Sequence, residues 1–453
     1  THITQHYLIA MRMHTAVLVL VLLAGVALPG AVSAPASARI DSLPDFTGVP
    51  PSFAQYSGYI TVNQTNGRNL FYWFVESEND PSSDPLVVWL QGGPGCSSLI
   101  GLMTENGPFR AVASADSLSG VALQRSAISW NRVANLLYID APAGVGYSYS
   151  DTHTDYATDN EKTAQDNYHF LQLWYKQFPE FATNPLWITG ESYAGDYIPQ
   201  LVAKILDEPH SSIADRLTGF LVGNPVLSCD GWKTRGNTIQ IENYYWNGLI
   251  SYSTYSLWMH SLCPGTTKNP PPECLDILAQ VNKEVGSIDP DNMFTNQCTG
   301  NATLDITETV PNCRSFQDLR DAYLNRADVQ AALHVTHPQT WVSCTTPAQL
   351  NYTTEWPNML PYYKRFFEQK PSLRIAIYSG TADIATVPHA YTQTCIAELG
   401  DPITKRWHPF QIEGVDEVAG YVENHQHFTF VAFRGLGHEV PMFGPASAFY
   451  LFS

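Results

Sequence analysis

The sequence has few basic residues, no CxxC cysteine pair and no long apolar run beyond its N-terminal segment. Its 453 residues include 24 Lys and Arg against 42 Asp and Glu, a formal net charge of −18 at pH 7. Nucleic acid is therefore not an expected partner, because no basic patch offsets the negative charge. The short pairs His334/His337 and His425/His427 are of a kind that often binds nothing, and no cysteine spacing suggests zinc. We expect no metal site and no cofactor.

The N-terminus has the layout of a secretory signal peptide within residues 1–38. Arg12 precedes an apolar core over residues 16–23, and small residues follow as far as Ala38, with plausible cleavage after Ala34 or Ala38. The apolar core is too short for a comfortable membrane span, and no later stretch reaches that length. An uncleaved anchor is the alternative reading. We expect no stable membrane span and entry into the secretory pathway.

The order of apolar runs predicts an α/β fold with an insertion. Apolar residues make up 44% of the chain, as in globular proteins, and the length allows two domains or one large domain with an insertion. Strands alternate with helices over residues 41–228, including a hairpin over 56–62 and 70–75 and a long helix over 155–178. Residues 229–357 are rich in Cys, Pro and Tyr and predict an inserted cap, mainly helical. Alternation returns over 358–453, and we see no internal repeat.

Ser192 stands at the apex of a strand–turn–helix segment. The apolar run 186–189 precedes Gly190-Glu191-Ser192-Tyr193-Ala194-Gly195, and a helical pattern follows. Such a turn holds a hydroxyl clear of the sheet and directs a helix N-terminus at it, which suits a nucleophile. Ala194 stands where the motif usually has Gly, and it is still small. Alone, the match also fits a Ser in a helix-capping turn.

Two residues downstream could complete a catalytic triad in the α/β-hydrolase order of Ser, acid and His. Asp383 follows a predicted buried strand over 373–378, and His438 follows another over 428–433. Both lie where strands end, the edge at which open α/β sheets keep their sites. Each alone could be an ordinary loop residue, but their order and placement favour catalysis.

A glycine-rich loop supplies candidate oxyanion donors. The strand over 86–90 runs into Gln91-Gly92-Gly93-Pro94-Gly95, whose backbone can approach a ligand closely. A backbone amide of this loop and the amide of Tyr193 could together bind a tetrahedral oxyanion. By itself the loop also fits an ordinary Gly/Pro turn.

Taken together, these segments resemble the serine carboxypeptidases of lysosomes, vacuoles and secretions, which have the α/β-hydrolase fold with a mostly parallel twisted sheet flanked by helices. The resemblance covers the chain from about Leu43 to the C-terminus. The segments that carry it are 89–98, 105–109, 129–131, 140–149, 190–195, 223–225, Asp383 and 437–441.

The resemblance implies a serine-type exopeptidase that releases single residues from the C-termini of peptides and proteins through an acyl-enzyme. Ser192 would be the nucleophile, His438 the base and Asp383 its orienting acid. Gly93 and Tyr193 would donate their backbone amides to the oxyanion. An acyltransferase or a lyase on the same scaffold, or a protective binding partner, are the alternatives.

The resemblance also implies a subsite for the substrate's terminal carboxylate, formed by Trp89, Gln91, Gly92, Glu191 and Glu105. Gln91 stands where the family usually has Asn, so its amide lies one methylene further out. Two adjacent carboxyls cannot easily both ionise, so Glu191 and Glu105 would share a proton, and activity would be best at acidic pH. Glu439, next to His438, would favour Lys or Arg as the released residue.

Eight cysteines and three sequons agree with an oxidising compartment. By resemblance Cys96 pairs with Cys344, Cys263 with Cys274, and Cys298 with Cys313, while Cys229 and Cys395 either join each other or leave a free thiol. Asn63, Asn301 and Asn351 are candidate glycosylation sites. The expected location is secreted, lysosomal or vacuolar, and the resemblance also suggests a homodimer.

Overall fold

The computed structural model describes residues 34–453, apart from residues 118, 266–269, 297–314, 347, 355–356 and 413–416. Residues 1–33 of the expected signal peptide, the expected Cys298–Cys313 pair and the sequon at Asn301 lie outside the described residues. No helix in the described part of the chain is long and apolar enough to cross a membrane.

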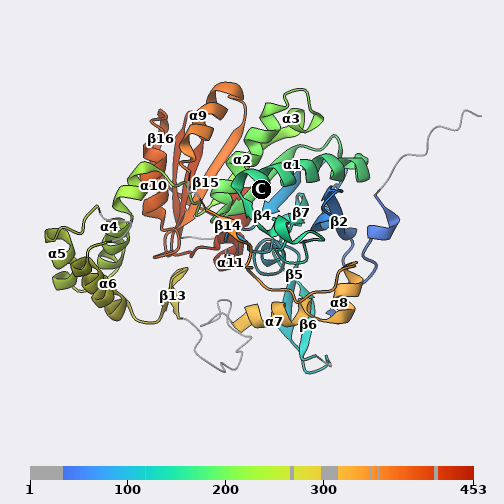
Figure 1. The fold of residues 1–453 in the computed structure, drawn as a ribbon, viewed down its shortest axis with the longest axis horizontal. Coiled ribbons are helices and arrows are strands. Elements are labelled where there is room, and N and C mark those ends of the chain that lie inside the picture. Colours follow the sequence, from blue (N-terminus) through green and yellow to red (C-terminus); the bar gives the residue numbers. More distant parts are fainter. Residues whose placement is uncertain are drawn as a thin grey trace, which may run out of the picture. The chain divides into compact units, whose positions relative to one another are not determined.

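An eleven-stranded twisted sheet is the centre of the fold, as the sequence predicts (Figure 1). Its path is β16-β17-β18-β15-β11-β10-β4-β7-β3-β2, and β8 pairs with β3. The strands are β2 (Gln55–Asn63), β3 (Arg68–Val75), β4 (Leu86–Leu90), β7 (Asn135–Ile139), β8 (Tyr149–Ser150), β10 (Leu186–Glu191), β11 (Leu217–Gly223), β15 (Arg374–Gly380), β16 (Ile403–Gln411), β17 (Val418–His425) and β18 (Thr429–Phe433).

The middle of the sheet is parallel and its margins are antiparallel. Strands β7, β4, β10, β11, β15 and β18 pair in parallel, so their carboxyl ends meet at one edge. The expected hairpin is β2–β3, and β16–β17 forms a second hairpin at the opposite margin. Every residue of β4 and β7 is buried, as in parallel strands that are covered on both faces.

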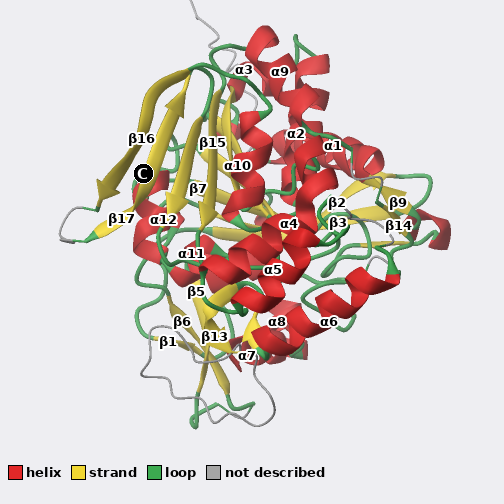
Figure 2. Ribbon diagram, turned by 90° about the vertical axis from the view of Figure 1, so that its left-hand side faces the viewer, coloured by secondary structure: helices red, strands yellow, loops and turns green. Residues whose placement is uncertain are grey.

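Helices cover both faces of the sheet (Figure 2). Alternate residues of β4 serve the two sides: Leu86 and Val88 pack in the core shared with α1, α2 and α9, whereas Val87 and Trp89 face the side of α7, α11 and α12. The helices are α1 (Asn160–Gln177), α2 (Ala194–Asp207), α3 (Ser212–Arg216), α4 (Asp230–Trp246), α5 (Tyr252–His260), α6 (Pro272–Val285), α7 (Ser315–Leu324), α8 (Ala327–Ala332), α9 (Leu360–Gln369), α10 (His389–Ala397), α11 (Val440–Phe443) and α12 (Pro445–Phe452).

The long helix predicted over residues 155–178 begins five residues later than expected, at Asn160. The Asp159 carboxylate accepts a hydrogen bond from the backbone N–H of Lys162 at 2.8 Å and caps the helix there. Residues 153–156 instead form a single 3₁₀ turn. The side-chain cap therefore decided the boundary, which apolar periodicity could not locate.

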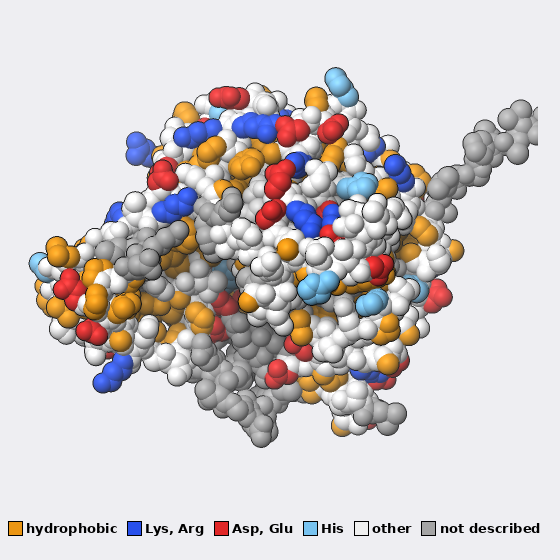
Figure 3. Space-filling model, in the orientation of Figure 1, with side chains coloured by type: hydrophobic (Ala, Val, Ile, Leu, Met, Phe, Trp, Pro, Cys, Tyr) orange, Lys and Arg blue, Asp and Glu red, His pale blue; other side chains and the backbone are white. Residues whose placement is uncertain are grey.

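The segment predicted as a cap is mainly helical, and its first part has its own small core. Buried residues of α4, α5 and α6, including Trp258 and Ile277, cluster with Ile384, the neighbour of Asp383. Helices α7 and α8 instead pack on the sheet's own core. Apolar side chains also gather at the surface over α4–α6, among them Trp246 and Leu262 (Figure 3). The proposed cap boundaries at 229 and 357 remain a prediction.

The remaining strands form small sheets: β1 (Phe46–Thr47), β5 (Phe109–Ala113) and β6 (Val121–Arg125) in one, β9 (Thr158–Asp159) with β14 (Tyr352–Thr353), and β12 (Ile288–Asp289) with β13 (Asn292–Asn296). Among the described residues there are three disulfides, two that join distant parts of the chain and one local. Cys96–Cys344 and Cys263–Cys274 are the pairs that the resemblance implied. Cys229 and Cys395 join each other and tie the start of α4 to α10, which settles the alternative left open by the sequence.

Candidate active site

Ser192 occupies a sharp turn between β10 and α2. Its φ is +60°, a left-handed conformation that is uncommon for a residue with a side chain and costs on the order of 1–3 kcal/mol. Two backbone bonds hold the turn: the Ser192 N–H donates to the Gly223 carbonyl at 2.9 Å, and the Ser192 carbonyl accepts from the Val226 N–H at 2.9 Å. Helix α2 begins two residues later, at Ala194.

Small residues around Ser192 are required by close backbone contacts. A Cβ on Gly190 would lie 2.1 Å from the Leu90 carbonyl oxygen, and one on Gly195 would lie 2.3 Å from the Val226 carbonyl oxygen. Both distances are below any real Cβ contact. The Ala194 methyl fits in this space, so its departure from Gly in the usual motif is tolerated.

Asp383 and His438 form a buried pair at the same edge of the sheet. Asp383 follows β15 and His438 follows β18, while Ser192 follows β10, and the neighbouring strand β11 separates β10 from β15. The His438 Nδ1 lies 2.6 Å from the Asp383 Oδ2, with Asp383 fully buried and His438 5% exposed. The contact assigns the proton to Nδ1 and leaves Nε2 as the acceptor that a general base needs.

The charge on His438 is set by competing effects. Burial alone lowers the pKa of the imidazolium, but Asp383, Glu439 and Glu105 raise it, and the net effect is a pKa above the ordinary value. A proton on the Glu105 carboxyl removes one of these negative charges. The protonation of His438 is therefore linked to that of its acidic neighbours.

The glycine-rich loop after β4 lies directly against the turn of Ser192. A Cβ on Gly92 would meet the Tyr193 backbone nitrogen at 2.6 Å and the Ser192 Cβ at 2.7 Å, so only glycine fits there. Gly93 follows with φ +116° and a cis bond to Pro94. The loop thus brings the backbone of residues 92–93 beside the Tyr193 amide, the arrangement that an oxyanion site requires.

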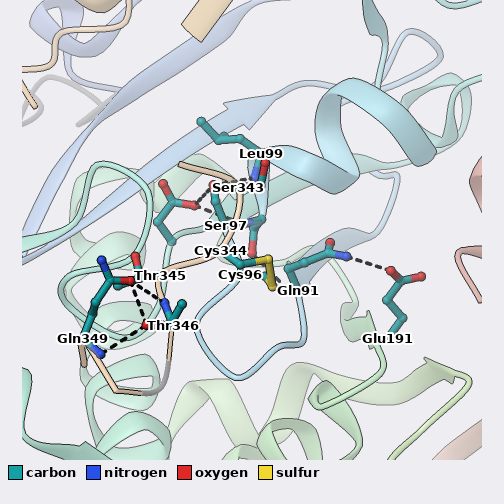
Figure 4. The surroundings of a disulfide bond; sticks show 12 residues. Gln91, Cys96, Ser97, Leu99, Glu191, Ser343, Cys344, Thr345, Thr346 and Gln349 are labelled. Carbon is teal, nitrogen blue, oxygen red and sulfur yellow. Dashed lines mark hydrogen bonds between the residues drawn. A yellow bond between two sulfur atoms is a disulfide. The ribbon is translucent and has the colours of Figure 1, made fainter. Parts of the chain in front are cut away.

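Two features hold this loop in place, the disulfide Cys96–Cys344 and the Asp140 carboxylate. The sequence predicted only the disulfide. The expected disulfide Cys96–Cys344 ties the loop to the segment between α8 and α9 (Figure 4). The second anchor is Asp140, a buried carboxylate that accepts from the Ser97 hydroxyl at 2.6 Å and the Ser98 N–H at 3.0 Å. Burial raises the pKa of Asp140 to about 7 against these hydrogen bonds. Asp140 is the first residue of the segment 140–149, which carries the resemblance to the family. This position was the only indication of its importance in the sequence.

Gln91 connects the two predicted carboxyls of the substrate subsite. Its Nε2 donates to the Glu191 Oε1 at 2.7 Å, drawn in Figure 4, and to the Glu105 Oε1 at 3.1 Å. Its Oε1 accepts from the Trp89 indole N–H at 2.7 Å. The longer side chain of Gln91 therefore reaches both acids, and Trp89 fixes which way its amide points.

Glu105 and Glu191 share one buried space. Both are at most 1% exposed, and the second oxygen of each carboxyl accepts no hydrogen bond from an N–H or from a hydroxyl of the described residues. Burial, the other carboxyl of the pair and Glu439 raise the pKa of Glu191 well above the ordinary range, while burial and Glu439 also raise the pKa of Glu105. A proton shared between the two would satisfy both free oxygens.

Glu439 faces this acidic pair from the start of α11. It directly follows His438, is partly buried, and its Oε2 has no hydrogen-bond partner among the described residues. Its negative charge raises the pKa of Glu105, Glu191 and His438. Glu439 is thus the third carboxylate of the site.

Asn224 is a site residue to which the sequence assigned no role. It follows β11, is fully buried, and its Nδ2 donates to the Asp383 Oδ2 at 2.9 Å. Its only sequence signal was its place in the segment 223–225 that carries the resemblance. Among the described residues, no group of three or more His, Cys, Asp or Glu could hold a metal ion.

A strand–helix turn with a serine at its apex, a buried acid–histidine pair and a glycine loop at the carboxyl edge of a mostly parallel sheet are the features of an α/β-hydrolase. The serine carboxypeptidase family matches residues 44–453. The chain belongs to this family and is by class a serine-type carboxypeptidase.

Known relatives agree with that assignment. Serine carboxypeptidase-like 27 of Arabidopsis thaliana is 37% identical over 438 residues, covering 91% of this chain and 90% of the relative. Serine carboxypeptidase 24 of the same plant is 36% identical, with coverage of 91% and 90%. The crystal structure of Kex1(Δ)p, a prohormone-processing carboxypeptidase of Saccharomyces cerevisiae, is 20% identical with a TM-score of 0.72 and covers 92% of this chain and 95% of its own, which shows the shared fold.

Proposed function

We propose that this enzyme releases single amino acids from the C-termini of peptides and proteins through an acyl-enzyme on Ser192, and works best at acidic pH. The observation that carries the proposal is the buried cluster of Gln91, Glu191 and Glu105, in which Glu191 directly precedes Ser192. An endopeptidase has no use for a carboxylate-binding cluster beside its serine, whereas an exopeptidase must recognise a free C-terminus.

In the first half-reaction the Ser192 Oγ attacks the carbonyl carbon of the last peptide bond while the His438 Nε2 takes the hydroxyl proton. The backbone amides of Gly93 and Tyr193 donate to the resulting oxyanion. His438 then gives the proton to the leaving amine, and the C–N bond breaks. The C-terminal amino acid departs, and the rest of the peptide stays as an ester on Ser192.

In the second half-reaction a water molecule takes the place of the departed amine. The His438 Nε2 accepts a proton from this water as its oxygen attacks the ester carbonyl, and then returns the proton to the Ser192 Oγ. Asp383 holds the proton on the His438 Nδ1 throughout. The shortened peptide leaves with a new C-terminal carboxylate, so the cycle can repeat.

Recognition of the C-terminus depends on the protonated form of the carboxyl pair. With one shared proton, Glu191 donates a hydrogen bond to the substrate carboxylate, and the amide of Gln91 adds a second neutral donor. When both carboxyls are ionised, they repel the same substrate. Because the pKa of each acid is raised, this loss falls at a higher pH than for ordinary glutamates.

Glu439 gives the leaving-residue side of the site a negative charge. A Lys or Arg side chain at the substrate's C-terminus would complement this charge, so we propose that the enzyme tolerates or prefers basic C-terminal residues. The partner-free Oε2 of Glu439 supports this assignment.

The direct test is incubation of a mixed peptide panel at acidic pH, with stepwise mass loss from the C-terminus as the readout. Ser192→Ala is the matched control, since it removes one oxygen and leaves the fold intact. Loss of single C-terminal residues by the wild type alone supports the proposal. Transfer of an acyl group to an added alcohol without peptide trimming would instead assign an acyltransferase. If the wild type and Ser192→Ala preserved the activity of a partner protein equally well, a protective binding role would be assigned.

We also propose the secretory pathway as the location. Three disulfides among the described residues suit an oxidising compartment. The sequon residue Asn351 is exposed and Asn63 is partly exposed at the end of β2, so both are accessible for glycosylation. A mass shift on glycosidase treatment of the protein from its native host tests both sites.

A further inference from the structure

Asn224 connects the nucleophile turn to the catalytic acid. Its backbone N–H donates to the Tyr378 carbonyl at 2.7 Å, which fixes it between β11 and β15. The residue before it, Gly223, accepts from the Ser192 N–H, and Val226 donates to the Ser192 carbonyl, both at 2.9 Å. Residues 223–226 therefore touch the turn of Ser192 on one side and the loop of Asp383 on the other.

The side chain of Asn224 uses both ends of its amide. Its Oδ1 accepts from the Gly380 N–H at 3.0 Å, and its Nδ2 donates to the Asp383 Oδ2 at 2.9 Å and to the Val387 carbonyl at 3.3 Å. This pattern fixes the orientation of the amide, because in the reverse orientation the Asn224 NH₂ group would point at the Gly380 N–H, and two donors would oppose each other. A short side chain with one donor and one acceptor end is needed here, and Asn also tolerates the φ of +38°.

The Asp383 Oδ2 is the same oxygen that binds His438. It accepts from the His438 Nδ1 at 2.6 Å, from Asn224 at 2.9 Å and from the Val387 N–H at 3.0 Å, while the Oδ1 accepts from the Thr386 N–H at 3.0 Å. The carboxyl plane is thereby held on both sides of the histidine contact. Of these donors, Asn224 alone comes from outside the acid's own loop and the histidine.

We propose that Asn224 is a positioning residue of the catalytic triad, which aims the Asp383 carboxylate at His438 and couples its place to the Ser192 turn. The inference rests on the proposed roles of these three residues. Asn224 touches neither substrate nor the reacting atoms and acts through Asp383.

The proposal predicts an effect on the protonation of His438 as well as on rate. The neutral Asn224 donor draws off part of the negative charge that stabilises the imidazolium. Without this donor, the carboxylate interacts more strongly with the imidazolium, so His438 stays protonated to a higher pH. The other titratable groups around the pair keep their places: His389, Tyr391, Tyr244, Asp291, Glu105 and Glu439.

Asn224→Gly is the first test, because glycine accepts the positive φ without strain. We expect kcat/KM for a peptide acid to fall roughly tenfold or more, and the acidic limb of its pH profile to move upward by about half a pH unit. The matched control is Asn243→Ala. Asn243 is a buried amide on α4 that donates to the Ile384 carbonyl at 3.2 Å, one residue from Asp383, without touching the carboxylate. Its removal leaves the acidic limb in place.

Asn224→Asp is the second test and keeps the shape of the side chain. A protonated carboxyl at this position can donate to Asp383 as the amide does, whereas an ionised one repels it. Assayed on an N-blocked amino-acid ester, which makes no use of the Glu191–Glu105 pair, this variant should be active at acidic pH and lose activity at a lower pH than the wild type. The isosteric change also covers the case in which the glycine variant does not fold.

Either of two results overturns the proposal. The first is an acidic limb of Asn224→Gly that coincides with the acidic limbs of the wild type and of Asn243→Ala. The second is a pH profile of Asn224→Asp on the ester that matches the profile of the wild type. Both results presuppose a wild type that trims C-termini and a Ser192→Ala variant that does not. If the wild type itself releases no C-terminal residue, the proposed function fails instead, so the two failures are distinguishable.

Discussion

Replacing Glu191 by Gln should uncouple substrate binding from pH. In the wild type, Glu191 can donate to a substrate carboxylate only while the pair with Glu105 holds a proton. Gln carries a permanent N–H donor of nearly the same length and no charge. Its oxygen can still accept from Gln91, so the buried cluster keeps its hydrogen bonds. We expect the alkaline limb of kcat/KM for peptide acids to move upward or flatten in Glu191→Gln.

The magnitude follows from one charge-assisted hydrogen bond. Such a bond contributes roughly 1.5–3 kcal/mol, and each 1.4 kcal/mol is a factor of about ten in binding. Ionisation of the pair in the wild type should therefore lower kcat/KM by about 10- to 100-fold, mainly through KM. Over the same interval Glu191→Gln should change by less than about threefold.

The assay is a pH series of kcat/KM on one peptide with a free C-terminus and on the same peptide amidated. The amide makes no use of the pair, so its wild-type profile should lack the alkaline loss that the acid shows. His438 sets the acidic limb of both substrates, and this limb should keep its place in Glu191→Gln, because Glu191 is already protonated at acidic pH and its replacement removes no negative charge there. The reasoning would be refuted if kcat/KM of the wild type fell equally at alkaline pH for the peptide acid and for the peptide amide. It would also be refuted if the alkaline limb for the peptide acid were unchanged in Glu191→Gln.

Three further predictions follow from single contacts. Glu439→Met should lower the ratio of C-terminal Arg to C-terminal Leu release severalfold by removing the charge that faces a basic residue; an unchanged ratio in a competition assay contradicts this role. Replacing Cys96 and Cys344 by Ser should cost roughly 2–5 kcal/mol in the free energy of unfolding, read by denaturant titration, because this bond closes the longest loop of the three, with a sequence separation of 248. Burial raises the pKa of Asp196 to about 8, so its contribution to stability is present in full below about pH 4 and is lost as pH rises towards 8; Asp196→Asn should flatten this decline, and an equal slope in both proteins would contradict it.

Much of the fold could be predicted because its elements carry local signals. Strand β4 is a short, wholly apolar run and β7 is apolar after Asn135, and both are buried on both faces as such runs indicate. The start of α1 was misplaced because its N-terminus depends on the Asp159 cap, one hydrogen bond that periodicity does not report. The packing of α7 and α8 on the sheet core was also not foreseen, since both lie within a segment whose composition indicated a separate cap.

Short-range chemistry in the chain was enough to specify the turn at Ser192, the glycine loop after β4, and the strand ends that deliver Asp383 and His438. Each needs particular residue types within a few positions of one another, so each leaves a readable pattern. The pairing of Cys229 with Cys395, the contact of Asn224 with an acid 159 residues away, and the two hydrogen bonds by which Gln91 bridges Glu105 and Glu191 depend on which strands become neighbours. Strand order is a property of the whole packed sheet, and only the folded chain decided it.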